Sequence, residues 1–357
     1  MERRYPYALN LSLILSMLGT PICLASTDDV NGVIGESTLG WNVSHGYPQA
    51  EKDQESLQKK VPAMLAKHQY AALDSLADTL RASKAKYPNG HDALYTFYNQ
   101  IELPRTAPDQ DWTNRLNDLN QWQTQYPDSK VAPAALVAYW VSFAWKARGS
   151  GYSNTVKEQG WKNFADRLAN GHAVLDKARA KKDACPFLYV QGQVVALGES
   201  WKRPEYDKLF EEAIKRFPDS NEFYFQKVYN LQPRWDGGET EWPDFAAKAA
   251  DKIGGANGDK LYARIAWYIS NLGFYDNMFT EFPNLKWSRI DQGMQALLKE
   301  YPNSANVQNE YLKLAIQAGK TALSKQLLAK IGKNVDVAIW KRKADFLKVR
   351  ATILQGK

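Results

Sequence analysis

Residues 126–147 read YPDSKVAPAALVAYWVSFAWKA, and this stretch decides the fold class. Its second part, residues 131–147, is apolar almost all round, which is typical of a helix buried on every side. Asp128 and Ser129 are good helix N-caps, and Pro133 is tolerated in a first helical turn. The stretch therefore predicts a central, buried helix that follows a sharp turn.

The turn at the start of this stretch recurs along the chain. An aromatic residue packs at the end of one helix, proline prevents the helix from continuing, and Asp, Asn or Ser accepts hydrogen bonds from the free amides of the next helix. The four copies are Tyr87-Pro88-Asn89-Gly90, Tyr126-Pro127-Asp128-Ser129, Phe217-Pro218-Asp219-Ser220 and Tyr301-Pro302-Asn303-Ser304. Runs that alternate with period two are missing, so the pattern predicts an all-α protein, an irregular α-solenoid of helical hairpins.

Around the third copy the chain resembles tetratricopeptide repeats. The second helix of that repeat has an aromatic residue or Leu, Ala three residues later and Pro five beyond, and Phe210, Ala213 and Pro218 match this pattern. The other units are degenerate, because the residue at the Ala position is Ser83, Trp122 or Leu297.

At a finer level, the chain from about residue 70 to 340 resembles a bacterial helical-repeat family catalogued as a domain of unknown function. The segments that carry this resemblance are residues 126–129, 144–149, 232–235 with Gly237 and Gly238, 287–289 and 301–304. Residues 311–316, YLKLAI, stand where the last repeat of the family has a Phe-Ala-x-Phe-Ala-Cys-like stretch. The resemblance implies no catalytic residues.

The N-terminus has the pattern of a secretory signal peptide. Arg3 and Arg4 precede an apolar run at residues 8–18 that is too short to span a bilayer, and small residues at Cys23 and Ala25 fit signal peptidase. Cleavage near Ala25 would send the mature protein to the periplasm. Residues 26–55 lack periodicity and predict an extended arm or linker, so the helical-repeat domain is expected at residues 56–357.

Composition and charge narrow the class of protein. The 357 residues are 44% hydrophobic and 24% charged, which argues against a disordered chain, and two cysteines cannot build a disulfide scaffold. The formal net charge of +7 is a C-terminal feature, because residues 318–357 hold eight Lys and two Arg against two Asp. A basic amphipathic helix is expected at about 335–354, with an apolar stripe through Trp340, Ala344, Leu347, Ala351 and Leu354. Its basic candidates for surface binding are Lys341, Arg342, Lys348 and Arg350.

The search for catalytic or metal chemistry yields no convincing set. The four histidines lie far apart, at positions 45, 68, 91 and 172, and neither HExxH nor CxxC occurs. Two Ser-x-x-Lys pairs, Ser56 with Lys59 and Ser83 with Lys86, lack the other elements of penicillin-binding enzymes. We therefore expect no enzyme activity, no cofactor and no metal.

Two clusters of Trp, Tyr and Arg stand out, and these residue types dominate binding hot spots. They are Trp145, Arg148 and Tyr152 at a helix end, and Arg234, Trp235, Glu239 and Trp242 in a loop. One interpretation places them on a concave face that binds a peptide or sugar. The other is structural: the arginines cap helix ends or pair with carboxylates, and the tryptophans fill gaps between repeats.

The leading hypothesis is a non-enzymatic periplasmic helical-repeat scaffold that binds an envelope protein or peptide, in the assembly or positioning of an envelope machine such as a secretion system. The alternative is recognition of cell-wall glycan or an anionic membrane surface through the aromatic clusters and the basic helix. A hydrolase with an unrecognised site comes third. Nucleic acid is not an expected partner, because no basic strip interleaved with stacking aromatics crosses the main body.

Overall fold

The computed structural model describes residues 48–151, 153–181, 184–235, 237–340 and 342–355, and this part of the chain is all-helical. Its extended backbone pairs in one place, an isolated antiparallel bridge between Lys86 and Asp92. The helices are α2 (Pro48–Ala66), α3 (Tyr70–Ser83), α4 (Ala93–Asn99), α5 (Asp109–Gln125), α6 (Val131–Arg148), α7 (Glu158–Arg179), α8 (Pro186–Gly198), α9 (Arg203–Arg216), α10 (Glu222–Asn230), α11 (Glu241–Ile253), α12 (Gly255–Leu272), α13 (Met278–Glu281), α14 (Trp287–Glu300), α15 (Ala305–Gln317), α16 (Thr321–Ile331), α17 (Val337–Trp340) and α18 (Lys343–Gln355), with a short 3-10 helix at Ser153–Thr155.

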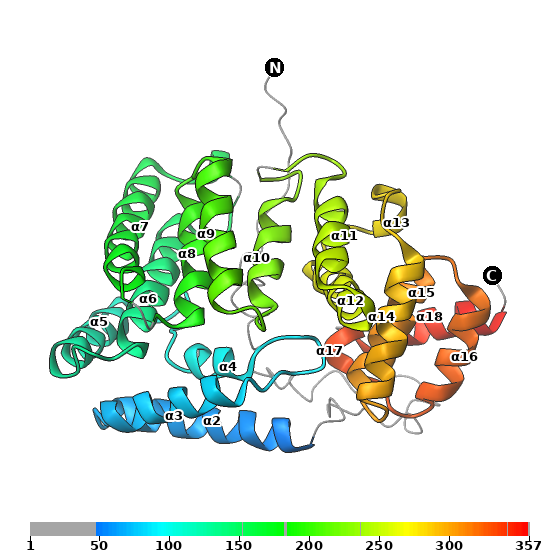
Figure 1. The fold of residues 1–357 in the computed structure, drawn as a ribbon, viewed down its shortest axis with the longest axis horizontal. Coiled ribbons are helices and arrows are strands. Elements are labelled where there is room, and N and C mark those ends of the chain that lie inside the picture. The colour runs from blue at the N-terminus through cyan, green and yellow to red at the C-terminus, as the bar shows by residue number, and fades with distance from the viewer. Residues whose placement is uncertain (1–47, 152, 182–183, 236, 341, 356–357) are drawn as a thin grey trace.

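Helices α5 to α16 lie side by side across the molecule (Figure 1). Five of them, α6, α8, α10, α12 and α15, form a core row, in which each helix contacts the next one in the row. Four intervening helices each pack on two helices of this row: α7 on α6 and α8, α9 on α8 and α10, α11 on α10 and α12, and α14 on α12 and α15. The core-row helices are buried almost all round, whereas the intervening helices are amphipathic.

Helix α6 confirms the central buried helix predicted from residues 131–147. Fourteen of its residues are buried, Pro133 among them in the first turn. The Ser129 hydroxyl accepts from the backbone N–H of Val131 at 3.2 Å and of Ala132 at 3.0 Å, so it caps the helix as its position predicts. The hydroxyl itself donates to Asp74 of α3 at 2.6 Å, which ties the cap to the preceding helices.

The recurring aromatic–proline turns share one hydrogen bond, in which the backbone N–H of the fourth residue donates to the carbonyl of the aromatic residue. The N···O distances are 2.8, 2.9, 3.2 and 3.1 Å in chain order. Tyr126, Phe217 and Tyr301 each end a helix with ψ values of 71°, 67° and 65°, outside the helical region that a following proline disfavours. Tyr87 differs, because α3 already ends at Ser83. A fifth copy, at residues 282–285, has the same bond at 2.9 Å and ends α13.

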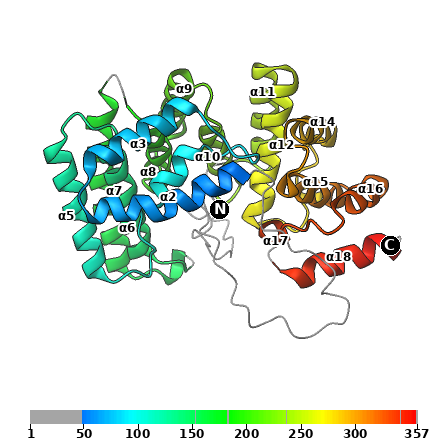
Figure 2. The ribbon, with the colours of Figure 1, turned by 90° about the horizontal axis from the view of Figure 1, so that it is seen from below.

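The N-terminal helices α2 and α3 lie across the underside of the row (Figure 2). Helix α2 begins at Pro48, inside the expected arm, and Leu57, Val61 and Leu65 bury one face of it at helical spacing. The helical region therefore starts earlier than residue 56. The signal peptide at 1–25 and the arm as far as residue 47 lie outside the described residues.

The loop from residue 84 to 92 reaches from α3 to α10 and α12 of the core row. Its His91 Nδ1 lies 2.7 Å from Glu222 Oε1 at the start of α10, and Arg264 Nε of α12 donates to the Pro88 carbonyl at 3.0 Å. The loop turns at Gly90, whose φ is +93° and where a Cβ would lie 2.7 Å from the Arg264 side chain. Only glycine fits this close approach.

At the C-terminus, the prediction of a single basic helix at about 335–354 is wrong. Two helices, α17 and α18, are separated after Trp340, so the helical phase restarts. Phe346 and Ile353 are the buried residues of α18, whereas Ala344 and Ala351 of the expected stripe are exposed. Among the described residues, no helix is both long and apolar enough to cross a membrane.

Candidate partner-binding site

The two predicted clusters divide into buried and accessible residues. Trp145 is 2% exposed and Trp242 is 0% exposed, so both belong to the core, packed edge-on against Phe164 and Phe282. Arg148 is 7% exposed, Arg234 and Trp235 are half-buried, and Glu239 is exposed. Tyr152 lies outside the described residues.

Arg148 is held at the end of α6, where Gly149 stops the helix with a positive φ of 75°. Its Nη1 donates to the carbonyls of Gly149 at 3.2 Å and Gly151 at 3.1 Å, so it ties down the loop that follows its own helix. The guanidinium also lies 5.6 Å from the ring of Trp145 and 5.2 Å from that of Trp161. Trp161 is 39% exposed, so one side of this stack faces solvent.

The loop after α10 is folded tightly, and this positions Arg234 and Trp235. The backbone N–H of Trp235 donates to the Gln232 carbonyl at 2.9 Å. A Cβ on Gly237 would lie 1.9 Å from the Leu231 carbonyl oxygen. Position 237 therefore has no room for a side chain. Gln232 is anchored by donating to the Val228 carbonyl at 2.7 Å.

Both loop side chains pack against aromatic rings of neighbouring segments. The Arg234 guanidinium lies 3.8 Å from the centre of the Phe274 ring, a close cation–π contact. Trp235 packs against Tyr229 of α10, with ring centres 5.8 Å apart. Phe274 also contacts Tyr229, at 6.3 Å, so Tyr229 lies beneath both loop residues.

Charges from both predicted clusters act on the Tyr229 hydroxyl. Burial raises its pKa well above the ordinary value, whereas the charge of Arg234, a hydrogen bond with the Trp235 side chain and the charges of Arg105 and Arg148 lower it. We name Arg105, Arg148, Tyr229, Arg234 and Trp235 the arginine–tyrosine cluster. Arg105 and Tyr229 were missed by the sequence analysis, because no sequence signal linked the segment after α4 to the end of α10.

Three of the five residues of the cluster are arginines. Burial lowers the pKa of Arg105 to about 10, a shift that the charge of Glu102 opposes and that of Arg148 increases. Burial also lowers the pKa of Arg148. Among the described residues, no carboxylate lies within 4.0 Å of the guanidinium of Arg148 or Arg234.

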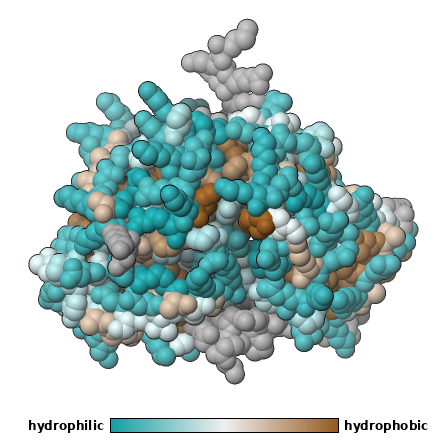
Figure 3. Space-filling view, viewed as in Figure 1, coloured by the Kyte–Doolittle hydropathy of each residue, from teal (hydrophilic) through white to brown (hydrophobic). Residues whose placement is uncertain are grey.

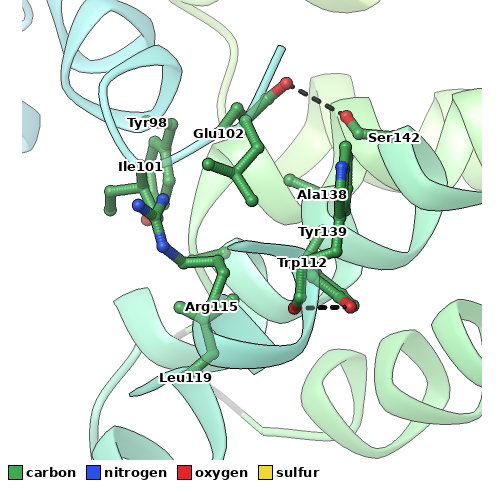
Figure 4. Close-up of a pocket in the computed structure, with 11 residues that line it drawn as sticks. Tyr98, Ile101, Glu102, Trp112, Arg115, Leu119, Ala138, Tyr139 and Ser142 are labelled. Carbon is green, nitrogen blue, oxygen red and sulfur yellow. Dashed lines mark hydrogen bonds between the residues drawn. The ribbon is translucent and has the colours of Figure 1, made fainter. Parts of the chain in front are cut away.

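A small cavity lies next to the cluster, between the segment after α4, α5 and α6 (Figure 4). The Glu102 carboxylate accepts from the Ser142 hydroxyl at 3.2 Å, and burial raises the pKa of Glu102 to about 7. The Tyr139 hydroxyl donates to the Trp112 carbonyl at 3.0 Å across the cavity floor. The cavity has about 10 Å³ of space, enough for a single water molecule and too little for an organic ligand.

A second group of charges, which we name the loop polar cluster, joins residues 84–92 to α10. Glu222 is fully buried; its Oε1 faces His91 Nδ1 and accepts from the Asp92 N–H at 3.2 Å. Ser220 donates to Asp92 at 2.6 Å. Burial lowers the pKa of His91, but the negative charge of Glu222 outweighs this effect, so the pKa is raised overall. The pKa of Asp92 is raised to about 7, mainly by burial and secondly by the charge of Glu222. These groups are enclosed by protein, so the cluster fixes the loop. Within the described part of the chain, no three His, Cys, Asp or Glu side chains are placed to hold a metal ion.

The predicted C-terminal basic residues form no cluster with aromatic side chains. Lys341 lies outside the described residues, and exposed Arg342 is paired with Asp345 at 2.9 Å. Lys348 and Arg350 are exposed on α18.

Comparison with known proteins gives one match. Residues 57–190 match the model of a family described as Domain of unknown function (DUF4034). This supports the expected resemblance to a domain of unknown function over α2 to the start of α8, a span that includes Arg105 and Arg148 but not Tyr229 or Arg234. No curated protein and no solved structure matches the chain.

Proposed function

We propose that this chain is an α-solenoid of tetratricopeptide-like helical pairs that binds another protein or a peptide as a non-enzymatic scaffold. The observation that carries the proposal is the arginine–tyrosine cluster, to which three separate segments of the chain contribute. Arg, Trp and Tyr are the residue types that dominate protein-binding hot spots. A row of packed helix pairs offers an extended surface for such a partner.

The surface around the cluster favours recognition by polar and aromatic groups together. The face shown in Figure 3 is mostly hydrophilic, with apolar residues near its middle. Trp161 and the half-buried Trp235 supply flat apolar area, and Arg234 supplies charge beside them. The signal-peptide pattern of residues 1–25 supports a partner in the cell envelope, where an assembly such as a secretion machine is one proposed client.

Photo-crosslinking in the producing cells tests the proposal. Benzoylphenylalanine at position 161 or 235 is expected to capture one envelope protein, whereas the same probe at exposed Lys208 of α9 should capture none. The captured protein, once purified, must bind the wild-type chain in solution and lose affinity for Trp235→Ala. Adducts at 161 and 235 that do not differ from those at 208 would overturn the proposal.

Exposed Lys348, Arg350 and Leu354 on α18 support a second candidate, peripheral contact with anionic cell-wall polymer or lipid. Co-sedimentation with vesicles that contain anionic lipid measures it. Electrostatic binding should vanish as salt rises, because the Debye length falls from about 10 Å at 0.1 M to about 3 Å at 1 M. Binding that Lys348→Gln and Arg350→Gln together leave unchanged would exclude this helix as the contact.

A further inference from the structure

The C-terminal end of the helical row is basic on its surface. Lys325 and Lys330 are exposed on α16, and exposed Lys333 follows the end of this helix. Lys348 and Arg350 are exposed on α18. Helix α16 packs against α18, and the two lie side by side at one end of the molecule (Figure 2). We name these five residues the C-terminal basic surface.

No acid of this end of the chain balances the C-terminal basic surface. Between residues 318 and 357 the acids are Asp336, which is fully buried, and Asp345, which pairs with Arg342 at 2.9 Å. The residues at 341, 356 and 357, outside the described part, are Lys, Gly and Lys. Within the described part, no carboxylate lies within 4.0 Å of the five basic groups.

Helix α9 shows that this excess of positive charge is local. Its sequence, RPEYDKLFEEAIKR, holds four basic and four acidic residues, so its exposed Lys208 and Lys215 have acids close to them in sequence. Around Lys325 and Lys330, by contrast, residues 311–335 contain no Asp or Glu. Like charges on one surface repel each other, and an anionic partner relieves this repulsion. The surface therefore favours a partner that is uniformly negative.

An apolar side chain stands beside these charges on α18. Leu354 is 62% exposed, the most exposed large hydrophobic residue in the part of the chain that the structure describes. It follows Arg350 by four residues, so the two side chains lie on one face of the helix. A soluble polyanion would leave Leu354 in water, whereas the boundary between headgroups and acyl chains of a bilayer takes up apolar side chains. Basic and apolar side chains together favour a lipid surface.

We propose that the C-terminal basic surface binds the anionic headgroups of a lipid bilayer, with Leu354 inserted below them. This inference rests on the second candidate function, extends its contact from α18 to α16, and chooses lipid instead of cell-wall polymer. Flexible lysine stems let each ammonium reach a phosphate while the helix lies flat on the bilayer. Each Lys or Arg near an anionic leaflet raises membrane affinity about fivefold, so the charges of two helices add to a measurable affinity.

Co-sedimentation of the purified protein with vesicles tests the inference. The anionic vesicles contain phosphatidylcholine with about 30% phosphatidylglycerol, and the neutral vesicles contain phosphatidylcholine alone. The protein should sediment with the anionic vesicles and remain in solution with the neutral ones. Lys325→Gln, Lys330→Gln and Lys333→Gln together should lower the partition coefficient at least tenfold, because three surface charges are lost.

A matched control removes the same charge elsewhere. Lys202, Lys208 and Lys215 are exposed at α9, and their replacement by Gln should change the partition coefficient by less than about twofold, since distant charges are screened. All six lysines are exposed, so both triple variants are expected to keep the melting temperature of the wild type. Equal losses in the two triple variants would mean that net charge alone decides binding, and would overturn the surface.

Leu354→Ser distinguishes a bilayer from a soluble polyanion. It should lower the partition coefficient about threefold or more, because apolar area no longer leaves water, and it should not change binding to polyglutamate. A partition coefficient that Leu354→Ser leaves unchanged would assign the surface to anionic polymers instead of lipid.

The α18 variants separate this inference from the function on which it rests. If Lys348→Gln with Arg350→Gln abolishes sedimentation while the α16 triple variant binds as the wild type does, the second candidate function stands on α18 alone and the two-helix surface falls. A wild-type protein that sediments with neither kind of vesicle overturns the inference together with lipid as the second candidate's partner.

Discussion

Replacing Glu222 by Gln removes one negative charge from the loop polar cluster with almost no change of shape. The amide oxygen still accepts from the Asp92 N–H, but it no longer pairs with protonated His91. Removing one partner of a fully buried ion pair costs about 3–5 kcal/mol, and we expect about 3 kcal/mol at pH 5.5 because the amide retains one hydrogen bond.

The cost should shrink as pH rises, and the sign follows from two pKa shifts. The pKa of His91 is raised in the folded protein, mainly by Glu222 acting against burial, so its pairing stabilises the fold below about pH 6.5 and is lost as pH rises through the folded pKa. The pKa of Asp92 is raised to about 7 by burial and then by Glu222. Ionised Asp92 therefore destabilises the wild type as pH rises from about 4 to 7, and Gln relieves the repulsion. The charge of Lys86 lowers the pKa of Asp92, and the charge of Arg264 lowers the pKa of His91, but neither outweighs the effects above.

Urea unfolding followed by tryptophan fluorescence at pH 5.5, 7 and 9 measures these differences. Glu222→Gln should lower the free energy of unfolding by about 3 kcal/mol at pH 5.5 and by about 1 kcal/mol at pH 9. Exposed Glu205 of α9 provides the control, and Glu205→Gln should stay within about 0.5 kcal/mol at each pH. A loss that is constant with pH, or larger at pH 9, would refute a charged His91–Glu222 pair.

Three further outcomes follow from packing. Gly237→Ala should lower the free energy of unfolding by about 1–3 kcal/mol in thermal melts, because the added Cβ would lie 1.9 Å from a backbone carbonyl oxygen. Gly238→Ala should be neutral, because its nearest atom is 3.9 Å away. Equal effects of the two variants would contradict the tight loop. Phe346→Ala should lower the free energy of unfolding by about 3–5 kcal/mol, because Phe346 is fully buried. Leu354 is 62% exposed, so Leu354→Ala should lower it by less than about 0.5 kcal/mol. The reverse order would support the apolar stripe that the sequence predicted. Cys185 is buried and burial raises the pKa of its thiol, so iodoacetamide should label it in urea but not in native protein; fast native labelling would show that α8 opens readily.

Local sequence signals predicted the turns and the helix that is buried on all sides. The turn at Tyr126 could be read because proline and the Ser129 cap act within a few residues. The fifth turn, at Phe282, was missed because Leu285 stands where the other copies have Gly or Ser. The C-terminal stripe was wrong because α17 ends at Trp340 and α18 begins at Lys343, so residues before and after this break do not share one helical phase.

The candidate site could be predicted only in part. Arg148 and Arg234 were recognised by residue type, yet nothing in the sequence joined them. Tyr229 links them, and its neighbours Arg105 and Arg148 come from segments more than 80 residues earlier in the chain. Such convergence depends on how the helices of the core row pack, which periodicity within one helix does not reveal.

The loop between α3 and α4 sets the size of the cooperative folding unit. In a linear array of repeats, each repeat contacts its neighbours alone, so fragments retain structure and the array can be shortened. Here the loop residues His91 and Asp92 depend on Glu222, and Pro88 on Arg264, 176 positions later. A fragment cut at residue 190, where the family match ends, would leave this loop without its partners. The residues that match the family model therefore depend on contacts outside the matched span, and a fragment that ends at residue 190 is expected to leave His91 without its Glu222 partner.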